Sequence, residues 1–392
     1  MPQSIKTGFV GAGFASTFHY DSLLQTGLTG IDPVGVHSRG ADGRNQFAGD
    51  RGIKAFSSIE ELLESVDVVH VCTPAVTHES VTVAALKRNV HVIVEKPFTG
   101  YFGPEDDPEF EGSKAPKEPM RAKALASAKR MIEAESESRG NIFYAENWLY
   151  SPVVQKEAEI ISKTKAQILR LIAEESHSGS HSPSYGMWKY SGGGSLMGKA
   201  CHPLTAVLYL KRVEGEARRG KPIRPKAVSC RTHELTRIPD FEDRGQLRTD
   251  YTDVEDFGLM HIIFDDGTVA DVFASEIVMG GVYNWIEVFA NNHRTRCNIN
   301  PIDALETYNP VEKQFEDIYV VEKISTKQGW SKPAADENWM TGYVQELRTF
   351  YESILSGKLH LDYGELGYDT VDAIYSAYLS AERLGEEVGL VG

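Results

Sequence analysis

The stretch that decides the fold is Ile5-Lys6-Thr7-Gly8-Phe9-Val10-Gly11-Ala12-Gly13-Phe14-Ala15-Ser16. A short apolar run ends at Gly11, and the residues after Gly13 have helical spacing. Gly11 permits a tight turn, Gly13 lets the backbone approach a pyrophosphate, and the following helix offers N–H groups at its positive end. Ser16 replaces the third glycine of the pattern but is still small enough for close packing of helix and strand. The stretch therefore predicts a dinucleotide-binding turn rather than an incidental one. The cofactor contacts expected here are Gly11, Gly13, Phe14 and Ala15.

Strands and helices alternate through the first half of the chain. Further strands are expected at 31–36, 55–56, 66–72, 90–94 and 141–145, with helices between most of them. Such alternation implies right-handed crossovers and a doubly wound parallel sheet. Residues 99–119 are rich in Gly, Pro and acidic residues. We interpret them as an acidic surface insertion, with a lid or docking segment as the alternative.

The second half has a different pattern. Strands are expected at 168–174, 227–235, 257–264, 268–275 and 285–290, and two helices at 338–356 and 368–384 close the chain. Successive strands without intervening helices favour a large, mainly antiparallel open sheet. The sequence thus predicts an α/β protein of two domains. Residues 1–147 would bind the cofactor, and residues 148–392 would bind substrate and form oligomers.

Composition excludes several classes of protein. The 392 residues suffice for two domains, and 41 Lys and Arg against 56 Asp and Glu give a net charge of −15, which argues against nucleic-acid binding. No run of 18 apolar residues and no signal-peptide pattern is present, so we expect a cytoplasmic protein without a membrane span. The cysteines have no disulfide or zinc spacing and are expected to be reduced thiols. They are Cys72, Cys201, Cys230 and Cys297.

The end of the second strand bears on the choice of cofactor. It reads His37-Ser38-Arg39, without the carboxylate that would take a ribose 2′-OH. Ser38 and Arg39 could hold a 2′-phosphate, with Arg44 about one helical turn away, which favours NADP. Arg39 could equally stack on adenine or face solvent, which leaves NAD open.

Several separated motifs extend over essentially the whole chain. They are Gly11-Ala12-Gly13, Cys72-Thr73-Pro74 with His78, Glu95-Lys96-Pro97, Gly192-Gly193-Gly194-Ser195-Leu196-Met197 leading to Cys201-His202, and Glu255-Asp256-Phe257. In this order and spacing the chain resembles the Gfo/Idh/MocA family of oxidoreductases, named after glucose-fructose oxidoreductase and inositol dehydrogenase. The resemblance implies an amino-terminal Rossmann domain and a carboxy-terminal α/β domain whose open sheet often builds oligomer interfaces. We expect a homodimer or homotetramer.

The same resemblance implies catalytic roles for Lys96 and His202. Lys96 is expected beside the nicotinamide, where its ammonium would stabilise a developing alkoxide, and a cis peptide bond before Pro97 is compatible with the family. His202 is expected to accept and return the hydroxyl proton. Further cofactor contacts are expected from Thr73, Pro74, His78, Glu95 and Lys96.

The chain departs from the family around His202. Many relatives carry Asp four residues before this histidine and Asp three residues after it, where this chain has Gly198 and Thr205. Lys199 could place a second cation in the site, although helical lysines are commonly solvated. The usual proton relay is therefore incomplete, and the base could instead be fed by Glu174, Glu175, His177 or His181.

Residues 174–182, which follow a predicted strand, are dense in hydrogen-bonding side chains. A carbohydrate needs several convergent donors and acceptors, and aromatic rings to cover its C–H faces. We therefore interpret the segment as a polyol-recognition loop, with a plain loop as the alternative. A metal on the two histidines of the loop is a minor alternative, and no metal is expected. Substrate contacts are expected from Glu174, His177, His181, Tyr185, Trp188, Lys199 and His202.

Three functions follow from these patterns. The leading hypothesis is an NAD- or NADP-dependent dehydrogenase for a secondary hydroxyl of a sugar, sugar derivative, cyclitol or glycoside. The alternative is a redox-neutral glycosidase that oxidises its substrate transiently, eliminates the aglycone, adds water and returns the hydride. A non-catalytic cofactor sensor is disfavoured because Lys96 and His202 are both present.

Overall fold

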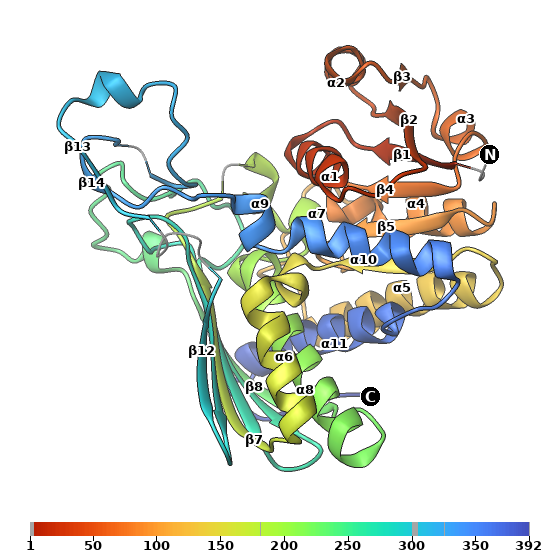
Figure 1. Cartoon of the computed structure of the whole chain (residues 1–392). Coiled ribbons are helices and arrows are strands. Elements are labelled where there is room, and N and C mark those ends of the chain that lie inside the picture. Colours follow the sequence, from red (N-terminus) through yellow and green to blue (C-terminus); the bar gives the residue numbers. More distant parts are fainter. Residues whose placement is uncertain (1–3, 181, 300–304, 325, 392) are drawn as a thin grey trace. The chain divides into compact units, whose positions relative to one another are not determined.

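The structure is a computed structural model that describes residues 4–180, 182–299, 305–324 and 326–391. The chain divides into two compact units (Figure 1). The first consists of Met1–Tyr101, Ala122–Glu146 and Tyr343–Val371, and the second of the remaining three segments. Residues 343–371 therefore belong to the first unit although they follow the predicted boundary at residue 147. The assignment of cofactor and substrate roles to residues 1–147 and 148–392 stays a prediction.

The first unit is built on a six-stranded parallel sheet in the order β3-β2-β1-β4-β5-β6. The strands are β1 (Ile5–Val10), β2 (Ile31–His37), β3 (Lys54–Ala55), β4 (Val68–Val71), β5 (His91–Glu95) and β6 (Ile142–Ala145). All four residues of β4 are buried, as expected for a strand covered on both faces. This sheet confirms the predicted doubly wound fold. Strand order reverses between β1 and β4, and ligands of such folds bind beyond the carboxyl ends of the strands at this point.

Helices connect the parallel strands. Those of the first unit are α1 (Phe14–Gln25), α2 (Ala41–Arg51), α3 (Ile59–Leu63), α4 (His78–Leu86) and α10 (Tyr343–Ser356). Helices α5 (Lys117–Ser136) and α11 (Tyr363–Glu382) each contribute residues to both units. Helix α10 packs against α1, which explains why a segment so late in the sequence joins the first unit (Figure 1).

The second unit contains a seven-stranded sheet in the order β12-β11-β7-β10-β9-β8-β15. Only β7 and β10 run parallel to each other, and the other neighbouring pairs are antiparallel, which confirms the predicted mainly antiparallel sheet. Helices α6 (Pro152–Thr164) and α8 (Cys201–Arg219) cross one face of this sheet (Figure 1). The strands are β7 (Ile168–Ser176), β8 (Pro225–His233), β9 (Phe257–Phe264), β10 (Val269–Ser275), β11 (Tyr283–Ala290), β12 (Arg294–Asn298) and β15 (Val388–Gly389).

Short elements complete the described part of the second unit. They are the 3₁₀ helices Asn147–Tyr150, Pro183–Gly186, Leu235–Arg237 and Glu312–Phe315, a π-helical turn at Leu196–Ala200, helices α7 (Trp188–Ser191) and α9 (Glu337–Met340), and the hairpin of β13 (Thr307–Asn309) and β14 (Gly329–Ser331). A further 3₁₀ turn, Ala75–Thr77, precedes α4 in the first unit.

The insertion at 99–119 is only partly a surface loop. Its acidic residues are exposed, but Gly112 is buried and donates its N–H to Asp253 at 2.7 Å. The ammonium of Lys117 is also buried, and it donates to the carbonyl oxygens of Gly112, Ser113 and Ala115. The end of the insertion is therefore core, because Lys117 satisfies backbone oxygens that water cannot reach.

Two further sequence predictions concern the whole chain. All four cysteines are free thiols, and three of them are buried. Among the described residues no helix is long and apolar enough to cross a membrane. The cytoplasmic location stays a prediction.

Candidate functional site

The glycine turn lies at the carboxyl end of β1. Gly11 has φ +110°, and a Cβ there would lie 2.5 Å from the carbonyl oxygen of Cys72, so only glycine fits. A Cβ at Gly13 would meet nothing within 4 Å, which leaves the backbone open to a ligand. Ser16 donates its hydroxyl to the Gly11 carbonyl at 2.9 Å. The serine in the third position thus stabilises the turn.

The amino end of α1 suits an anion. Its N-cap is Gly13, and no side chain of the described residues caps the helix. Phe14 is 69% exposed and Ala15 is half-buried, so the first turn is accessible. The N–H groups of a first helical turn have no partner within the helix and carry the positive end of its dipole. The turn therefore fits the pyrophosphate of a dinucleotide.

Two arginines lie at the end of β2. Arg44 donates from Nη1 to the carbonyl oxygen of Ser38 at 2.8 Å, and Arg39 is exposed. No carboxylate ends this strand. Two guanidinium groups therefore belong to residues that follow the carboxyl end of β2, and their contact with a cofactor stays a prediction.

The loops after β4 and β5 are joined through His78. Its Nδ1 lies 2.9 Å from the carbonyl oxygen of Pro97, and its Nε2 lies 2.9 Å from that of Thr73. The ring is fully buried, and burial lowers its pKa despite the two carbonyl contacts. His78 is expected to contact the cofactor, but its buried ring instead lies between the two loops and bonds to a backbone carbonyl of each. Thr73 is half-buried and Pro74 is exposed, so these two residues present the loop surface.

Glu95 and Lys96 follow at the end of β5. The Glu95 carboxylate is almost buried, with Oε1 2.8 Å from His19 Nε2 and Oε2 accepting the Lys96 backbone N–H at 3.0 Å. Lys96 is half-buried, and the Lys96–Pro97 peptide bond is cis. These residues share the carboxyl edge of the sheet with the glycine turn, since β5 and β1 both pair with β4 in parallel.

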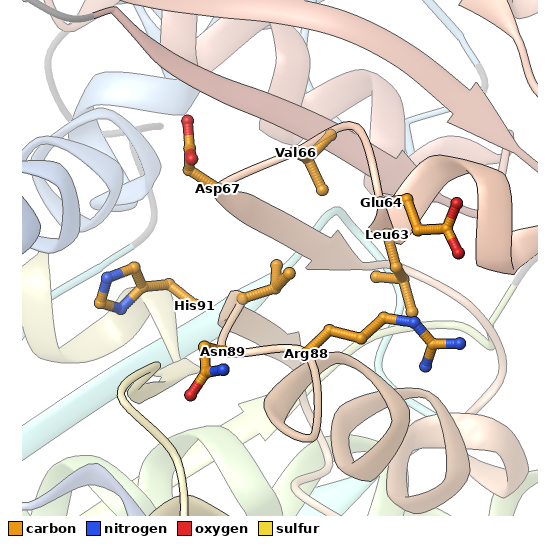
Figure 2. Close-up of a pocket in the computed structure, with 8 residues that line it drawn as sticks. Leu63, Glu64, Val66, Asp67, Arg88, Asn89 and His91 are labelled. Atoms are coloured by element: carbon orange, nitrogen blue, oxygen red, sulfur yellow. The ribbon is translucent and has the colours of Figure 1, made fainter.

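A surface pocket of about 480 Å³ lies at the opposite edge of the same sheet (Figure 2). Asp67 precedes β4 and His91 begins β5, so the pocket is at the amino ends of these strands. Side chains of Glu64 and Arg88 line it as well. Because dinucleotides bind at the carboxyl edge, this pocket is not the cofactor site.

In the second unit the glycine triplet wraps around Glu255. The N–H groups of Gly194 and Leu196 donate to its carboxylate at 3.1 and 2.9 Å, and Tyr378 donates its hydroxyl at 2.8 Å. A Cβ at Gly194 would collide with the Glu255 backbone, so the close approach requires glycine. Burial raises the pKa of Glu255 to about 7 although these hydrogen bonds lower it. The triplet and the Glu255 motif therefore form one structural joint that precedes α8.

His202 lies in the first turn of α8. It is 6% exposed, stacks on Trp148 with ring centroids 5.9 Å apart, and its Nε2 lies 3.9 Å from Glu175 Oε2. Neighbouring residues of β7 point to opposite faces, so Glu174 lies on the other face, paired with Trp285 of β11. The expected role of Glu174 at the site is not supported, and Glu175 is the acid that faces His202. Trp148 was not predicted, because it lies outside any motif.

Lys199 belongs to a buried cluster. Its ammonium lies 3.1 Å from Glu276 Oε1 and donates to Ser180 Oγ at 3.0 Å, and its side chain is 3% exposed. The alternative of a solvated lysine is therefore wrong. Glu276 was missed from the sequence, although one signal was present. Acidic residues lie at the ends of both β7 and β10, and the ends of parallel strands meet at one edge.

In the segment 177–187, hydrogen bonds between side chains and backbone groups stabilise the loop. His181 lies outside the described residues. Arg248 donates from Nη1 to the carbonyl oxygens of Ser180 and Ser182 at 2.8 Å each. His177 Nδ1 accepts the Gly179 N–H at 3.0 Å, so its 3.8 Å approach to Glu276 Oε2 does not involve a protonated Nδ1.

Tyr185 packs where the family aspartate would stand. A Cβ at Gly198 would lie 3.1 Å from the Tyr185 ring, which is tighter than ordinary contact. The absence of a side chain at Gly198 therefore leaves room for this ring beside the π-helical turn. Tyr185 is half-buried, as a ring that covers a ligand would be.

Trp188 does not face a ligand. It is 1% exposed, lies 4.7 Å from the Tyr378 ring and 5.6 Å from the Lys117 ammonium, and donates its backbone N–H to Asp253 at 2.8 Å. The expected substrate contact is corrected to a core role. A sequence cannot distinguish an aromatic residue in the core from one in a binding loop when the two lie three residues apart.

The predicted residues thus form two sets. One lies at the carboxyl edge of the first sheet and comprises the glycine turn, Ser38, Arg39, Thr73, Pro74, Glu95 and Lys96. The other lies around the start of α8 and comprises His177, Tyr185, Lys199 and His202, together with the unpredicted Glu276 and Trp148. In the part of the chain that the structure describes, no group of three His, Cys, Asp or Glu side chains could hold a metal ion.

Comparisons with known proteins match the amino-terminal part of the chain. Residues 5–103 match the family GFO_IDH_MocA, described as "Oxidoreductase family, NAD-binding Rossmann fold". The UDP-N-acetylglucosamine 3-dehydrogenase of Acidithiobacillus ferrooxidans is 34% identical over 98 residues, which are 24% of this chain and 29% of that protein. The glucose-6-phosphate 3-dehydrogenase of Bacillus subtilis is 28% identical over 92 residues, which are 24% of this chain and 26% of that protein. The similarity therefore spans less than a third of these curated relatives.

A solved structure extends the likeness of the fold to the whole chain. The crystal structure of GenD2 from gentamicin A biosynthesis in complex with NAD has a TM-score of 0.80 and 21% identity, and the match covers 100% of this chain and 98% of that chain. At this identity the likeness establishes the fold alone. The family match is confined to residues 5–103, which carry the glycine turn and the Cys72-Thr73-Pro74 and Glu95-Lys96-Pro97 motifs, so this part of the chain is similar to the NAD-binding Rossmann domain of that oxidoreductase family.

Proposed function

We propose that the protein is an NAD- or NADP-dependent dehydrogenase that oxidises a secondary hydroxyl of a sugar, sugar derivative, cyclitol or glycoside. The observation that carries the proposal is the carboxyl edge of the parallel sheet. There an anion-binding turn at Gly11 and Gly13 shares one strand edge with Glu95 and Lys96.

The cofactor is held by the backbone more than by side chains. Gly13 and the open first turn of α1 take the pyrophosphate, and Thr73 and Pro74 line the neighbouring loop. Arg39 and Arg44 favour a 2′-phosphate and hence NADP, while the family description supports NAD. When bound, the nicotinamide ring accepts the hydride.

Lys96 and His202 have different roles toward the reacting hydroxyl. Loss of hydride from a carbinol carbon requires the attached O–H to release its proton. The Lys96 ammonium stabilises the negative charge that develops on this oxygen, and His202 takes the proton. Glu175, 3.9 Å from His202 Nε2, stabilises the imidazolium that results. In the reverse direction His202 returns the proton to the alkoxide.

The polar cluster of the second unit supports a hydroxyl-rich substrate. Lys199, Glu276, Ser180 and His177 supply charged and neutral hydrogen-bonding groups around the start of α8, and Tyr185 adds a ring for a C–H face. Both curated relatives are named as sugar 3-dehydrogenases, which supports a pyranose.

Assembly into a homodimer or homotetramer is part of the proposal. Helices α6 and α8 cover one face of the large sheet, while Leu259, Ile263 and Phe273 on the other face are only half-buried. Burial of these apolar side chains between two copies would stabilise an oligomer. Light scattering on the eluting protein would give twice or four times the 43.5 kDa chain mass, and a monomer would contradict this part.

The function is tested with purified protein against free sugars, cyclitols, sugar acids and aryl glycosides, each with NAD and with NADP. Absorbance of the reduced nicotinamide and release of the aglycone are followed together. A dehydrogenase forms reduced cofactor in proportion to an oxidised product with an intact skeleton. Aglycone release without accumulation of reduced cofactor would instead identify the redox-neutral glycosidase.

A further inference from the structure

A chain of five polar side chains runs through the parallel sheet of the first unit. Tyr351 donates its hydroxyl to Thr7 Oγ1 at 2.6 Å, and His70 Nε2 lies 2.9 Å from the same hydroxyl. The Nδ1 atoms of His70 and His19 are 2.8 Å apart, and His19 Nε2 lies 2.8 Å from Glu95 Oε1. Four of the five are fully buried, and Glu95 is 8% exposed. Apolar residues would fill this volume at a lower desolvation cost.

The direction of donation along these five side chains is defined, because the first donor is fixed. Thr7 donates to the carbonyl oxygen of Val68, so its own oxygen accepts from Tyr351. Tyr351 has then used its one hydrogen, and it accepts from Nε2–H of His70. If His70 is neutral, its Nδ1 carries a lone pair and must accept from Nδ1–H of His19.

His19 therefore donates from both ring nitrogens. Its Nδ1–H points to His70, and its Nε2 faces a carboxylate, which only accepts. A ring that donates twice is an imidazolium. The positive charge could in principle sit on His70 instead, but His19 is the ring in contact with the carboxylate.

The surrounding charges favour the same assignment. Burial lowers the pKa of His19, but Cys72 and Glu95 raise it, and the result is well above the ordinary value. Burial and His19 lower the pKa of His70. Burial also raises the pKa of Glu346 on α10 well above its ordinary value. The other titratable groups that face this cluster are Glu146, Tyr343 and Lys96.

We propose that His19 is a positioning residue that acts as a buried imidazolium on Glu95 and, through Glu95, on Lys96. One carboxylate oxygen is held by His19, and the other accepts the Lys96 backbone N–H at 3.0 Å. With both oxygens engaged, Glu95 fixes the backbone from which the Lys96 side chain projects. This inference rests on the proposed function, in which Lys96 contacts the reacting oxygen.

The variant Tyr351→Phe tests the direction of the chain at a distance from Lys96. Without the hydroxyl, His70 no longer needs its hydrogen on Nε2 and can carry it on Nδ1. His70 then donates to His19, which can be neutral and still donate to Glu95. The variant Tyr20→Phe is the matched control, because the Tyr20 hydroxyl donates to the Arg51 carbonyl oxygen at 3.4 Å and is not one of the five side chains.

Ring ¹⁵N shifts of the intact, histidine-labelled protein at about pH 8, above the ordinary histidine pKa, give the charge directly. The His19 signal is assigned with His19→Gln. We expect an imidazolium in the wild type and in Tyr20→Phe, and a neutral ring in Tyr351→Phe. A neutral His19 in the wild type would overturn the proposal.

Hydrogen exchange of the Lys96 amide measures the positioning itself. We expect this amide to exchange about tenfold faster in His19→Gln and in Tyr351→Phe than in the wild type, with no change in Tyr20→Phe. Turnover should fall by about tenfold in the first two variants, with KM values within about twofold. Equal Lys96 exchange in all four proteins would overturn the proposal. If the wild type turned over no compound of the panel, the dehydrogenase proposal would fail, and the amide exchange and ring shifts would still decide the role of His19.

Discussion

Lys96 is the residue on which the proposed chemistry depends most. Its ammonium is expected to act on the transition state, whereas the cofactor is held by the backbone of the glycine turn. Lys96→Met should therefore lower kcat by about a thousandfold and leave cofactor affinity within a few fold. Steady-state kinetics and fluorescence titration with cofactor measure the two effects. Lys87→Met, an exposed lysine of the same unit, is the control, and unchanged turnover in Lys96→Met would remove Lys96 from the mechanism.

The base is tested through the pH profile. His202→Ala should remove the acidic limb of the kcat/KM profile, because no ring is left to be protonated. Glu175→Gln should move that limb to lower pH, since the carboxylate 3.9 Å away favours the protonated ring. Glu174→Gln, on the opposite face of β7, should leave the profile in place. A profile unaffected by His202→Ala would transfer the proton to another group of the 174–187 segment.

The two arginines beside Ser38 decide the cofactor. If they hold a 2′-phosphate, Arg39→Ala and Arg44→Ala should each weaken NADP binding by about tenfold and leave NAD binding nearly unchanged. Calorimetric titration with both nucleotides measures this. Equal losses for NAD and NADP would mean that the guanidinium groups contact adenine or ribose and do not discriminate.

At the scale of single residues the sequence predicted which segments carry the site better than which side chains face it. Lys96, His202 and the glycines are marked by motifs, and their local geometry fits the expected chemistry. Glu174 and Glu175 are neighbours of the same type, and only the pleat of β7 separates their faces. Glu276 and Trp148 reach the start of α8 through tertiary packing, which spacing along the chain does not encode.

At the scale of elements, the buried Glu255 carboxyl group beside the glycine triplet leads us to predict how the unfolding free energy depends on pH. The Glu255 pKa is about 7 in the folded protein against an ordinary 4.5, so between these values the folded state keeps a proton that the unfolded state has released. The contribution is complete below about pH 4.5 and is lost as the pH rises through 7, at about 1.4 kcal/mol per pH unit. Glu255→Gln should flatten this part of the dependence of the unfolding free energy on pH.

Urea unfolding between about pH 4.5 and pH 8 measures the two slopes. Glu60→Gln, an exposed residue of α3, is the control and should keep the wild-type slope. A Glu255→Gln variant with the wild-type slope would show that Glu255 is ionised throughout.

Long, strongly patterned elements were predictable, and short ones were not. The strands of the parallel sheet and the central strands β7, β9, β10 and β11 follow from apolar runs between turn signals. The edge strands β12 and β15 are short and carry charged or small residues, so their pairing with β11 and β8 depends on the neighbouring strand. The sequence predicts a surface position for the end of the insertion at Lys117, and this is wrong. A buried lysine that donates to three carbonyl oxygens cannot be distinguished in sequence from a solvated one.

At the scale of the whole molecule, each of the two units is built from three separate segments of the chain, and the sequence does not reveal this division. Residues 343–371 belong to the first unit, where α10 packs against α1. Helix α10 supplies Tyr351 to the series of hydrogen-bonded side chains that ends at Glu95. The apolar periodicity of α10 predicted a helix but not its partner, because contacts between distant segments are set by tertiary packing. The family match covers residues 5–103, whereas the likeness in fold to a solved structure covers the complete chain.

Net oxidation by this protein requires that the hydride leave the substrate for the cofactor, and isotope labelling follows this transfer. The best substrate of the panel, deuterated at the carbon that bears the reactive hydroxyl, is incubated with cofactor, and both nucleotide and sugar are analysed by mass spectrometry. We expect one deuterium in the reduced nicotinamide for each ketone formed, and loss of this transfer in Lys96→Met. Deuterium that is retained in a hydrolysed sugar, with no reduced cofactor accumulated, would contradict a net dehydrogenase.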